Sequence, residues 1–470
     1  MERKYLMFNS RLNIYQKRKR QRKLPILAIV MAVPVSLILL ELLARLVVGI
    51  SGKSTELAAY EGEPANANAY RIEFLDQKKQ PYQGLSNRGK LAAQRSIAVG
   101  YKLVPGQQSN LWRINEQGFR DDIPVPLSKP KDEIRIFVLG GSTAFGQWNP
   151  SNEATLAHKL EVRLNQRVAQ QKNSPEKYRP QELPFYKPDL RKALALPPQI
   201  QGGNYRVINA AVPGYASGNE LAQLAIDILP YSPDAIVVLD GYTDLILPSD
   251  SQAMDIPRIE EFLSQASGHF WTVVSQRLDD AIADTYLVRA IQYWILRPQL
   301  SASELTLMAM DNQVPLAQHV TSDPSELERR VARYRLYHQK MVRLTAAAGI
   351  PLIIAIQPEI TGRAANSISQ PEKAILDELG GEYQKQIALS YQELAKAVSG
   401  LERGFPKNTK TLNLYNIYDK VPDRIFLDAI HLTDKGNAIL SDRLYQTIAA
   451  LPKLQIPPSR KLTEKEINGF

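Results

Sequence analysis

The chain has 470 residues, of which 44% are hydrophobic and 23% charged, which is enough for a large globular core. It contains no cysteine, and this excludes disulfides, thiolate metal sites and a cysteine nucleophile. Of the net charge of +10, residues 1–23 carry +8, from nine basic residues and one acidic residue, so only +2 belongs to the rest. The large remainder is nearly neutral, and we therefore expect no nucleic-acid binding.

Residues 24–50 form one strongly apolar stretch in which only Glu41 and Arg45 are charged. A helix of about 25 residues reaches roughly 37 Å, enough to cross a hydrocarbon core of ~30 Å. We predict an uncleaved transmembrane anchor, in which Pro34 can introduce a kink. The alternatives are a cleaved signal peptide and a buried helix of a soluble cytoplasmic enzyme, but no small-x-small cleavage site follows closely.

The basic tail, residues 1–23, precedes the anchor directly and is expected to stay cytoplasmic by the positive-inside rule. This predicts a single-pass protein of the cell membrane with its large domain outside, in the periplasm if the cell has an outer membrane. Residues 51–109 are polar with weak periodicity and predict a juxtamembrane spacer of low order. Residues 110–455 are expected to form the domain, and residues 456–470 a tail.

Strand and helix patterns alternate from residue 131 onward. Mostly continuous apolar runs predict buried parallel strands, and alternating strand–helix units predict a three-layer α/β/α domain around a five-stranded parallel sheet. The expected strands are residues 134–139, 205–210, 235–240, 351–356 and 411–417. The expected helices lie near 155–170, from 217 with Glu220 completing a capping box, over 326–348, within 371–398 and from 433.

Two insertions interrupt this alternation. Residues 165–204 are polar and rich in proline, lysine and glutamine. Residues 245–325 have a helical pattern and contain two aromatic clusters, Phe270–Trp271 and Tyr293–Trp294. One hypothesis is that the second insertion forms a lid or a membrane-facing helical hairpin. The alternative is a set of extra helices that pack on the main core.

Candidate functional residues follow four of the expected strands. Ser142 follows the first strand, Gly214 the second, Thr243 the third, and Asp428 and His431 the fifth. The carboxyl ends of parallel strands share one edge, so these positions can converge on one cleft. A serine hydroxyl needs a histidine to take its proton and an acid to orient that histidine. Of the five histidines, only His431 lies at the expected edge with a carboxylate close by.

Each of these pieces alone has a purely structural interpretation, as a turn residue or a helix start. The sequence around Ser142 is not a Gly-x-Ser-x-Gly elbow, because Ala144 replaces its second glycine, and it is neither a P-loop nor a dinucleotide-binding turn. Asp244 and Gln357 lie near the same expected edge, where they either shape the pocket or hydrogen-bond to the loops.

Four short blocks, in order, resemble the SGNH (GDSL-type) hydrolases: residues 139–146, 211–215, 241–244 and 428–431. The resemblance covers roughly residues 110–450. It implies a flavodoxin-like fold and cofactor-free acyl-ester chemistry on lipids, small esters or O-acetylated carbohydrates. It also implies that Gly214 helps to bind the oxyanion, while Ser142, His431 and Asp428 form the triad. Gly141 stands where many members have aspartate, and Thr243 stands at the position of the family's oxyanion asparagine.

From these patterns we predict a membrane-anchored extracytoplasmic serine esterase or deacetylase without cofactor or metal. Its expected partners are the membrane and an O-acylated envelope glycan or lipid as substrate; protein partners are not predicted. One alternative is an O-acetyltransferase with the same triad. Another is a non-catalytic glycan-binding or envelope-assembly component, which Thr243 favours because the loss of one oxyanion donor typically costs 10²–10³ in rate.

Overall fold

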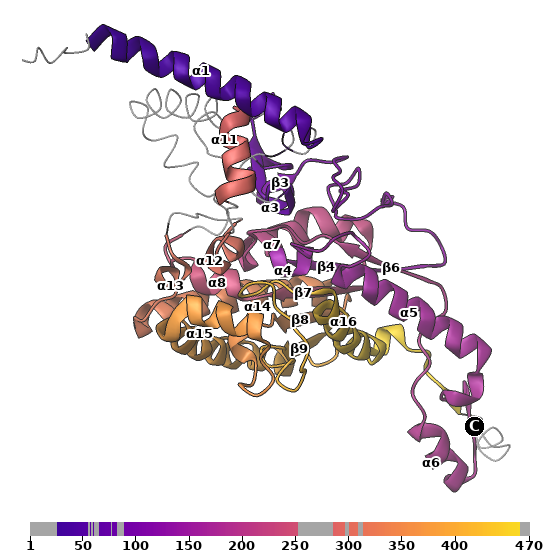
Figure 1. Ribbon diagram of the computed structural model, residues 1–470. Coiled ribbons are helices and arrows are strands. Elements are labelled where there is room, and N and C mark those ends of the chain that lie inside the picture. Colours follow the sequence, from indigo (N-terminus) through magenta and orange to yellow (C-terminus); the bar gives the residue numbers. More distant parts are fainter. Residues whose placement is uncertain are drawn as a thin grey trace, which may run out of the picture.

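The computed structural model describes residues 26–54, 57, 60, 65–76, 78–81, 89–251, 285–296, 300–308 and 314–460. At the centre of the domain lies a five-stranded sheet, parallel throughout, with the order β6-β4-β7-β8-β9 (Figure 1). In chain order this is 2-1-3-4-5, the doubly wound flavodoxin-like arrangement, and the predicted fold class is confirmed. The strands are β4 (Glu133–Gly140), β6 (Asn204–Asn209), β7 (Ala235–Asp240), β8 (Leu352–Ile356) and β9 (Thr409–Asn413).

Every residue of β7 and β8 is buried, as expected for central strands covered on both faces. The two layers of helices follow from their contacts: α5 packs against α16, and α14 packs against both α7 and α15. The expected strand over 411–417 is corrected, because β9 begins earlier and the chain turns away from the sheet after Asn413. The covering helices are α5 (Leu156–Asn173), α7 (Ser217–Gln223), α14 (Pro324–Ala347), α15 (Gln370–Gly404) and α16 (Asp434–Ala449).

The predicted capping box at α7 is wrong. The Ser217 hydroxyl donates to Asp244 Oδ1 at 2.5 Å, and its backbone N–H donates to Asp244 Oδ2 at 3.0 Å. Because the Ser217 hydroxyl is hydrogen-bonded to Asp244, it does not cap the start of the helix. The side chain of Asn219 accepts the Ala216 N–H instead, at 3.1 Å, and Glu220 is fully buried.

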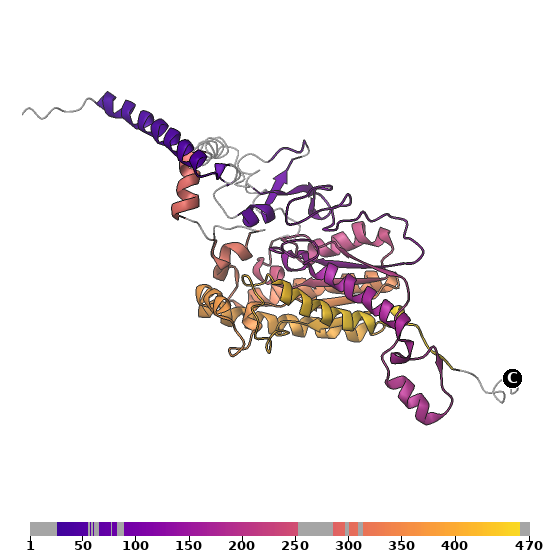
Figure 2. The same cartoon turned by 45° about the vertical axis from the view of Figure 1, so that its right-hand side comes forward.

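The low-order spacer predicted for residues 51–109 is also corrected. After the short helix α3 (Ala65–Tyr70), the strands β1 (Ile72–Leu75), β2 (Leu91–Ser96) and β3 (Gly100–Leu103) form a small sheet above the domain (Figure 2). The hydroxyl of Tyr101 donates to the carbonyl of Pro213 at 2.6 Å, so this sheet holds the loop after β6. Strands of four to six residues are too short for a clear periodic signal.

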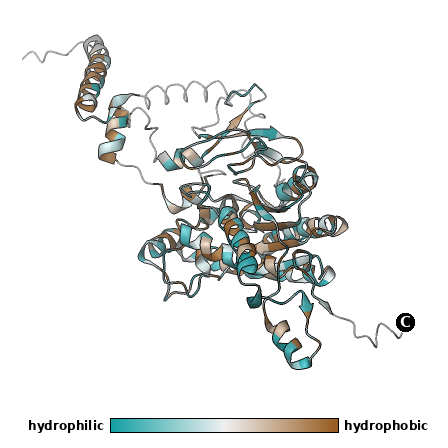
Figure 3. Ribbon diagram, turned by 90° about the vertical axis from the view of Figure 1, so that its right-hand side faces the viewer, coloured by the Kyte–Doolittle hydropathy of each residue, from teal (hydrophilic) through white to brown (hydrophobic). Residues whose placement is uncertain are grey.

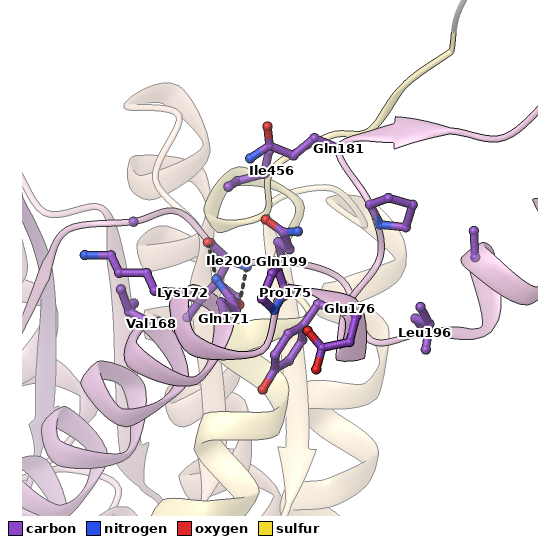
Figure 4. Close-up of a pocket in the computed structure, with 14 residues that line it drawn as sticks. Val168, Gln171, Lys172, Pro175, Glu176, Gln181, Leu196, Gln199, Ile200 and Ile456 are labelled. Carbon is purple, nitrogen blue, oxygen red and sulfur yellow. Dashed lines mark hydrogen bonds between the residues drawn. The ribbon is translucent and has the colours of Figure 1, made fainter.

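The polar insertion forms an arm that projects from the domain and carries α6 (Lys187–Ala195), as Figures 1 and 3 show. Its strand β5 (Glu182–Leu183) pairs in parallel with β10 (Ser459–Arg460), which ties down part of the expected C-terminal tail. A pocket at the base of the arm is lined by Gln171, whose amide exchanges two hydrogen bonds of 2.9 Å with the Ile200 backbone (Figure 4). This pocket lies at the C-terminal end of α5, far from the turn that holds Ser142.

The N-terminal helix α1 (Ile26–Ile50) stands apart from the domain (Figures 1 and 3), and most of its apolar side chains from Val33 onward are exposed. Residues 32–51, which comprise most of this helix and Ser51, form a stretch long and apolar enough to cross a membrane. In the helical insertion, residues 252–284, including Phe270 and Trp271, lie outside the described residues. The described pieces divide: α12 (Ala302–Thr306) and α13 (Leu316–His319) pack on α15, whereas α11 (Tyr286–Ala290) packs on α1.

Candidate active site

Ser142 lies at the carboxyl end of β4, as the first residue of the short helix α4 (Ser142–Phe145). The turn is tight because Gly140 has a φ of +148° and passes close to β7. A Cβ atom on Gly140 would lie 2.3 Å from the Leu239 carbonyl oxygen, so only glycine fits. Ser142 itself is 9% exposed, so the residue is almost completely covered by its neighbours at the sheet edge.

The loops after β6 and β7 meet this turn at Gly141. A Cβ atom there would lie 3.2 Å from the carbonyl oxygen of Tyr215 and 3.5 Å from Thr243 Oγ1. Tyr215 directly follows Gly214, which has a φ of +85°. The structure therefore brings Gly214 and Thr243 to the turn that carries Ser142, although these positions are far apart in the chain.

Asp428 and His431 form a fully buried pair in the loop after β9. His431 Nδ1 and Asp428 Oδ2 are 2.6 Å apart, while Asp428 Oδ1 accepts the backbone N–H groups of Ile430 and His431 at 3.0 and 2.9 Å. Burial alone would raise the pKa of Asp428, but the His431 ring and these hydrogen bonds hold it below its ordinary value. An ionised Asp428 fixes the proton on Nδ1 and leaves Nε2 as the basic nitrogen; among the residues that the structure describes, Nε2 has no hydrogen-bond partner.

Trp148 is a member of this cluster that the sequence did not reveal. Its Nε1–H lies 2.9 Å from Asp428 Oδ2, and its ring meets the His431 ring edge to face with centroids 5.9 Å apart. Because Nδ1 is protonated, the carboxylate oxygen is the acceptor of this indole hydrogen bond. Trp148 has a φ of +70°, an unusual conformation that aims its side chain at the pair, and no motif signals it in the sequence.

Three hydrogen bonds join the Ser142 turn to the His431 loop and to β8. Thr143 Oγ1 donates to the carbonyl of Ile430 at 3.2 Å and accepts from the Gln357 amide at 3.0 Å. Asn149 Nδ2 donates to the carbonyl of Leu432 at 3.3 Å. Gln357 thus stabilises the turn beside Ser142 by its hydrogen bond to Thr143. Asp244 instead accepts hydrogen bonds from Ser217.

The helical insertion also reaches this loop, which the sequence did not indicate. The backbone N–H of Ala429, next to Asp428, donates to Thr306 Oγ1 at 3.2 Å. Thr306 belongs to α12 and is buried. The insertion therefore supports the loop that carries the acid and the histidine.

A second buried group of acids lies beneath the end of β7. Asp240 accepts the Tyr334 hydroxyl at 2.9 Å and forms an ion pair with His338 Nε2 at 3.2 Å. Burial and the neighbouring Asp240 charge raise the pKa of Glu220 well above its ordinary value, which keeps Glu220 protonated. Among the residues the structure describes, no group of histidine and acidic side chains is arranged to hold a metal ion.

Glu359, which follows β8, is predicted to make folding pH-dependent. Burial raises its pKa to about 7, against opposing hydrogen bonds from Thr361 and Tyr383. The folded state thus binds the proton more tightly than the unfolded chain, whose glutamate has the ordinary value of 4.5. This stabilisation is fully present below pH 4.5 and is lost as the pH rises to about 7, a loss of about 3 kcal/mol.

The measurement is denaturant unfolding of wild type and Glu359→Gln at pH values from 4.5 to about 8, which spans the two pKa values. The wild type should lose stability relative to the variant as the pH rises through this window. Parallel curves for the two proteins would show that Glu359 is not the titrating group.

The fold and this edge define a doubly wound α/β protein with a serine turn and a buried Asp–His pair at the carboxyl ends of its strands. No protein-family model and no curated protein matches the chain. Among solved structures it is similar to a lipase/acylhydrolase from Enterococcus faecalis, with 13% identity, a TM-score of 0.33, and coverage of 70% of this chain and 100% of that one.

It is also similar to an acetyl xylan esterase, with 12% identity, a TM-score of 0.30, and coverage of 67% of this chain and 100% of the other. A third similar structure is a GDSL-like lipase from Bacteroides thetaiotaomicron, with 12% identity, a TM-score of 0.28, and coverage of 69% and 91%. With TM-scores this low, the similarities add nothing to the argument about function, which rests on the site itself.

Proposed function

We propose that the chain is a membrane-anchored serine esterase or deacetylase that acts outside the cytoplasm. The observation that carries this proposal is the buried Asp428–His431 pair, which leaves His431 Nε2 as a base at the sheet edge where Ser142 also lies. An activated serine requires such a base, and the base requires an acid to fix its tautomer. Trp148 assists by holding the Asp428 carboxylate from a second side.

In the proposed reaction, Ser142 Oγ attacks the ester carbonyl as its proton moves to His431 Nε2. The tetrahedral intermediate collapses when His431 returns this proton to the departing alcohol, which leaves an acyl group on Ser142. Water then attacks the acyl group as its proton moves to His431 Nε2, and His431 returns that proton to Ser142 Oγ as the carboxylic acid is released. The backbone N–H groups of Ser142 and Gly214, with the Thr243 hydroxyl, are the proposed donors to the oxyanion.

Thr243→Asn is expected to raise the rate of ester hydrolysis by roughly 10–100-fold. Thr243 Oγ1 already lies near Gly141, but asparagine reaches further and donates an amide N–H, and one oxyanion donor is typically worth 10²–10³ in rate. Hydrolysis of a chromogenic acetyl ester by the two proteins measures the effect, with Thr243→Val as the control without a donor. If neither the wild type nor Thr243→Asn hydrolyses the ester, the non-catalytic glycan-binding role takes the place of the enzyme.

The membrane location is proposed from α1, whose apolar surface is exposed along residues 32–51. With the basic tail inside, the domain faces outward. An anchored enzyme meets acyl esters of the envelope, so we propose an O-acylated glycan or lipid as the substrate class. Extraction of cell membranes with carbonate and high salt tests the anchor, and release of the chain into the supernatant would overturn it.

An O-acetyltransferase uses the same three residues, with a sugar hydroxyl in place of water. The two activities differ in their products. Incubation with an acetyl donor and an acceptor glycan, followed by analysis of both products, separates hydrolysis from transfer. Acetylated glycan without net release of acetate would replace the esterase with the transferase.

A further inference from the structure

The helical segment Tyr286–Leu296 lies on the anchor helix rather than on the catalytic domain. It comprises α11 and a π-helical turn, η4 (Ile291–Leu296), that continues it. Figures 1 and 2 both show α11 between α1 and the domain. Val48 of α1, Leu57 and Ala290 form a buried apolar cluster of their own, against which Tyr293 and Trp294 pack.

Glu41 fixes the start of this segment to α1. Its carboxylate accepts the backbone N–H groups of Tyr286 and Leu287 at 3.1 and 2.8 Å, and it pairs with Arg45 Nε at 2.8 Å. The Arg45 guanidinium in turn lies over the Tyr286 ring, 5.1 Å from its centroid. A carboxylate within an apolar span is costly unless it is paired, and here the first N–H groups of α11 are part of its pairing.

From Glu41 the segment leaves α1 at a steep angle and leads toward the domain (Figures 1 and 2). Ala290 lies with Val48, and further along Lys53 Nζ lies 5.6 Å from the centre of the Tyr293 ring. Lysine, tyrosine and tryptophan are typical of the boundary between lipid and water. The start of α11 is therefore level with the span of α1, because Glu41 lies within residues 32–51, and Tyr293 lies near Lys53, which follows the end of α1.

The outer side of the segment is apolar and uncovered. Ile291 is 37% exposed, Ile295 73% and Leu296 66%. We infer that Tyr286–Leu296 is a second membrane element, which inserts beside the anchor into the outer leaflet and uses its N-terminal N–H groups to satisfy Glu41. The occupant of the apolar face is the lipid bilayer, because the start of the segment is hydrogen-bonded to Glu41, which lies within residues 32–51 of the helix proposed to span it.

This element would also fix the distance of the catalytic edge from the membrane. The same insertion supplies Thr306, whose hydroxyl accepts the Ala429 N–H beside Asp428. The insertion thus contacts the anchor through α11 and the loop of the acid–histidine pair through α12. An enzyme held in this way is suited to substrates at the membrane surface.

The first test uses the cysteine-free full-length chain, reconstituted in phosphatidylcholine vesicles. Single cysteines at Ile291→Cys and Ile295→Cys carry an environment-sensitive fluorophore, and Leu194→Cys, on the exposed arm helix α6, is the matched control. Brominated lipids should quench the first two labels but not the third, and aqueous iodide should do the reverse. Quenching of all three labels by iodide would overturn the inference. Protection of the labels at 291 and 295 from both brominated lipid and iodide would overturn it in favour of a protein partner.

The second test is a disulfide between Val48→Cys and Ala290→Cys, which should form on mild oxidation in the same vesicles. Glu41→Ala should reduce this cross-link, and Glu41→Gln, which keeps an acceptor oxygen, should retain most of it. Failure of the cross-link to form would overturn the docking of α11 on α1. The inference rests on the proposed anchoring by α1, whose failure is distinguishable because the chain would then leave membranes on carbonate extraction.

Discussion

Replacing His431 with glutamine is expected to lower the rate of ester hydrolysis by roughly 10⁴–10⁶-fold, the loss typical of removing a triad member. Glutamine has a similar size and its amide can still donate to Asp428, so the buried carboxylate keeps its partners, including Trp148. What the variant lacks is a basic nitrogen in place of Nε2. The loss should therefore be chemical and not a consequence of unfolding.

Steady-state hydrolysis of a chromogenic ester measures this loss. The matched control is His158→Gln on α5, whose side chain lies outside the acid–histidine pair, and it should retain wild-type activity. Activity of His431→Gln within about tenfold of wild type would contradict the assignment of the general base.

Gly140→Ala is expected to destabilise the folded chain by roughly 2–6 kcal/mol, because it combines an unfavourable φ with a steric clash. The added Cβ would lie 2.3 Å from the Leu239 carbonyl oxygen and 2.7 Å from the Cβ of Ala144. The first contact is with the backbone of β7, which cannot move without disturbing the central sheet. Gly140, which forms the turn that places Ser142 at the sheet edge, therefore cannot be replaced by a residue with a side chain without a clash.

The control for this variant is Gly349→Ala at the end of α14. Its φ is +63°, but a Cβ atom there would meet nothing within 4 Å, so only the backbone strain of about 1–2 kcal/mol remains. Denaturant unfolding of the detergent-solubilised chains compares the two. Equal losses of stability would show that the close approach of β4 and β7 imposes no extra cost.

Four of the five central strands were predictable from the sequence because each is rich in apolar residues and bounded by turns. The expected strand 235–240 coincides with β7, where every residue is buried. β9 was misplaced because it is only partly buried and begins with the polar Thr409 and Lys410, so its pattern is weak at the start. The small sheet β1–β3 was missed because its short strands are stabilised by contacts far along the chain, such as that of Tyr101 with Pro213.

The positions of Ser142, Asp428 and His431 could be predicted because the ends of parallel strands share one edge. Their supporting residues could not. Trp148 reaches the pair only because its backbone adopts a positive φ, and Thr306 reaches the same loop only because α12 packs on α15. Ser217 shows the opposite failure: it fits a capping motif locally, but Asp244 binds its hydroxyl from another loop.

The most direct test of the central claim is whether Ser142 is an activated nucleophile. The full-length chain and Ser142→Ala would be treated with a fluorophosphonate probe, which reacts only with serines that a nearby base activates. We expect labelling of the wild type and its complete loss in the variant. A folded wild-type protein that remains unlabelled, or a variant that labels as strongly as the wild type, would contradict it.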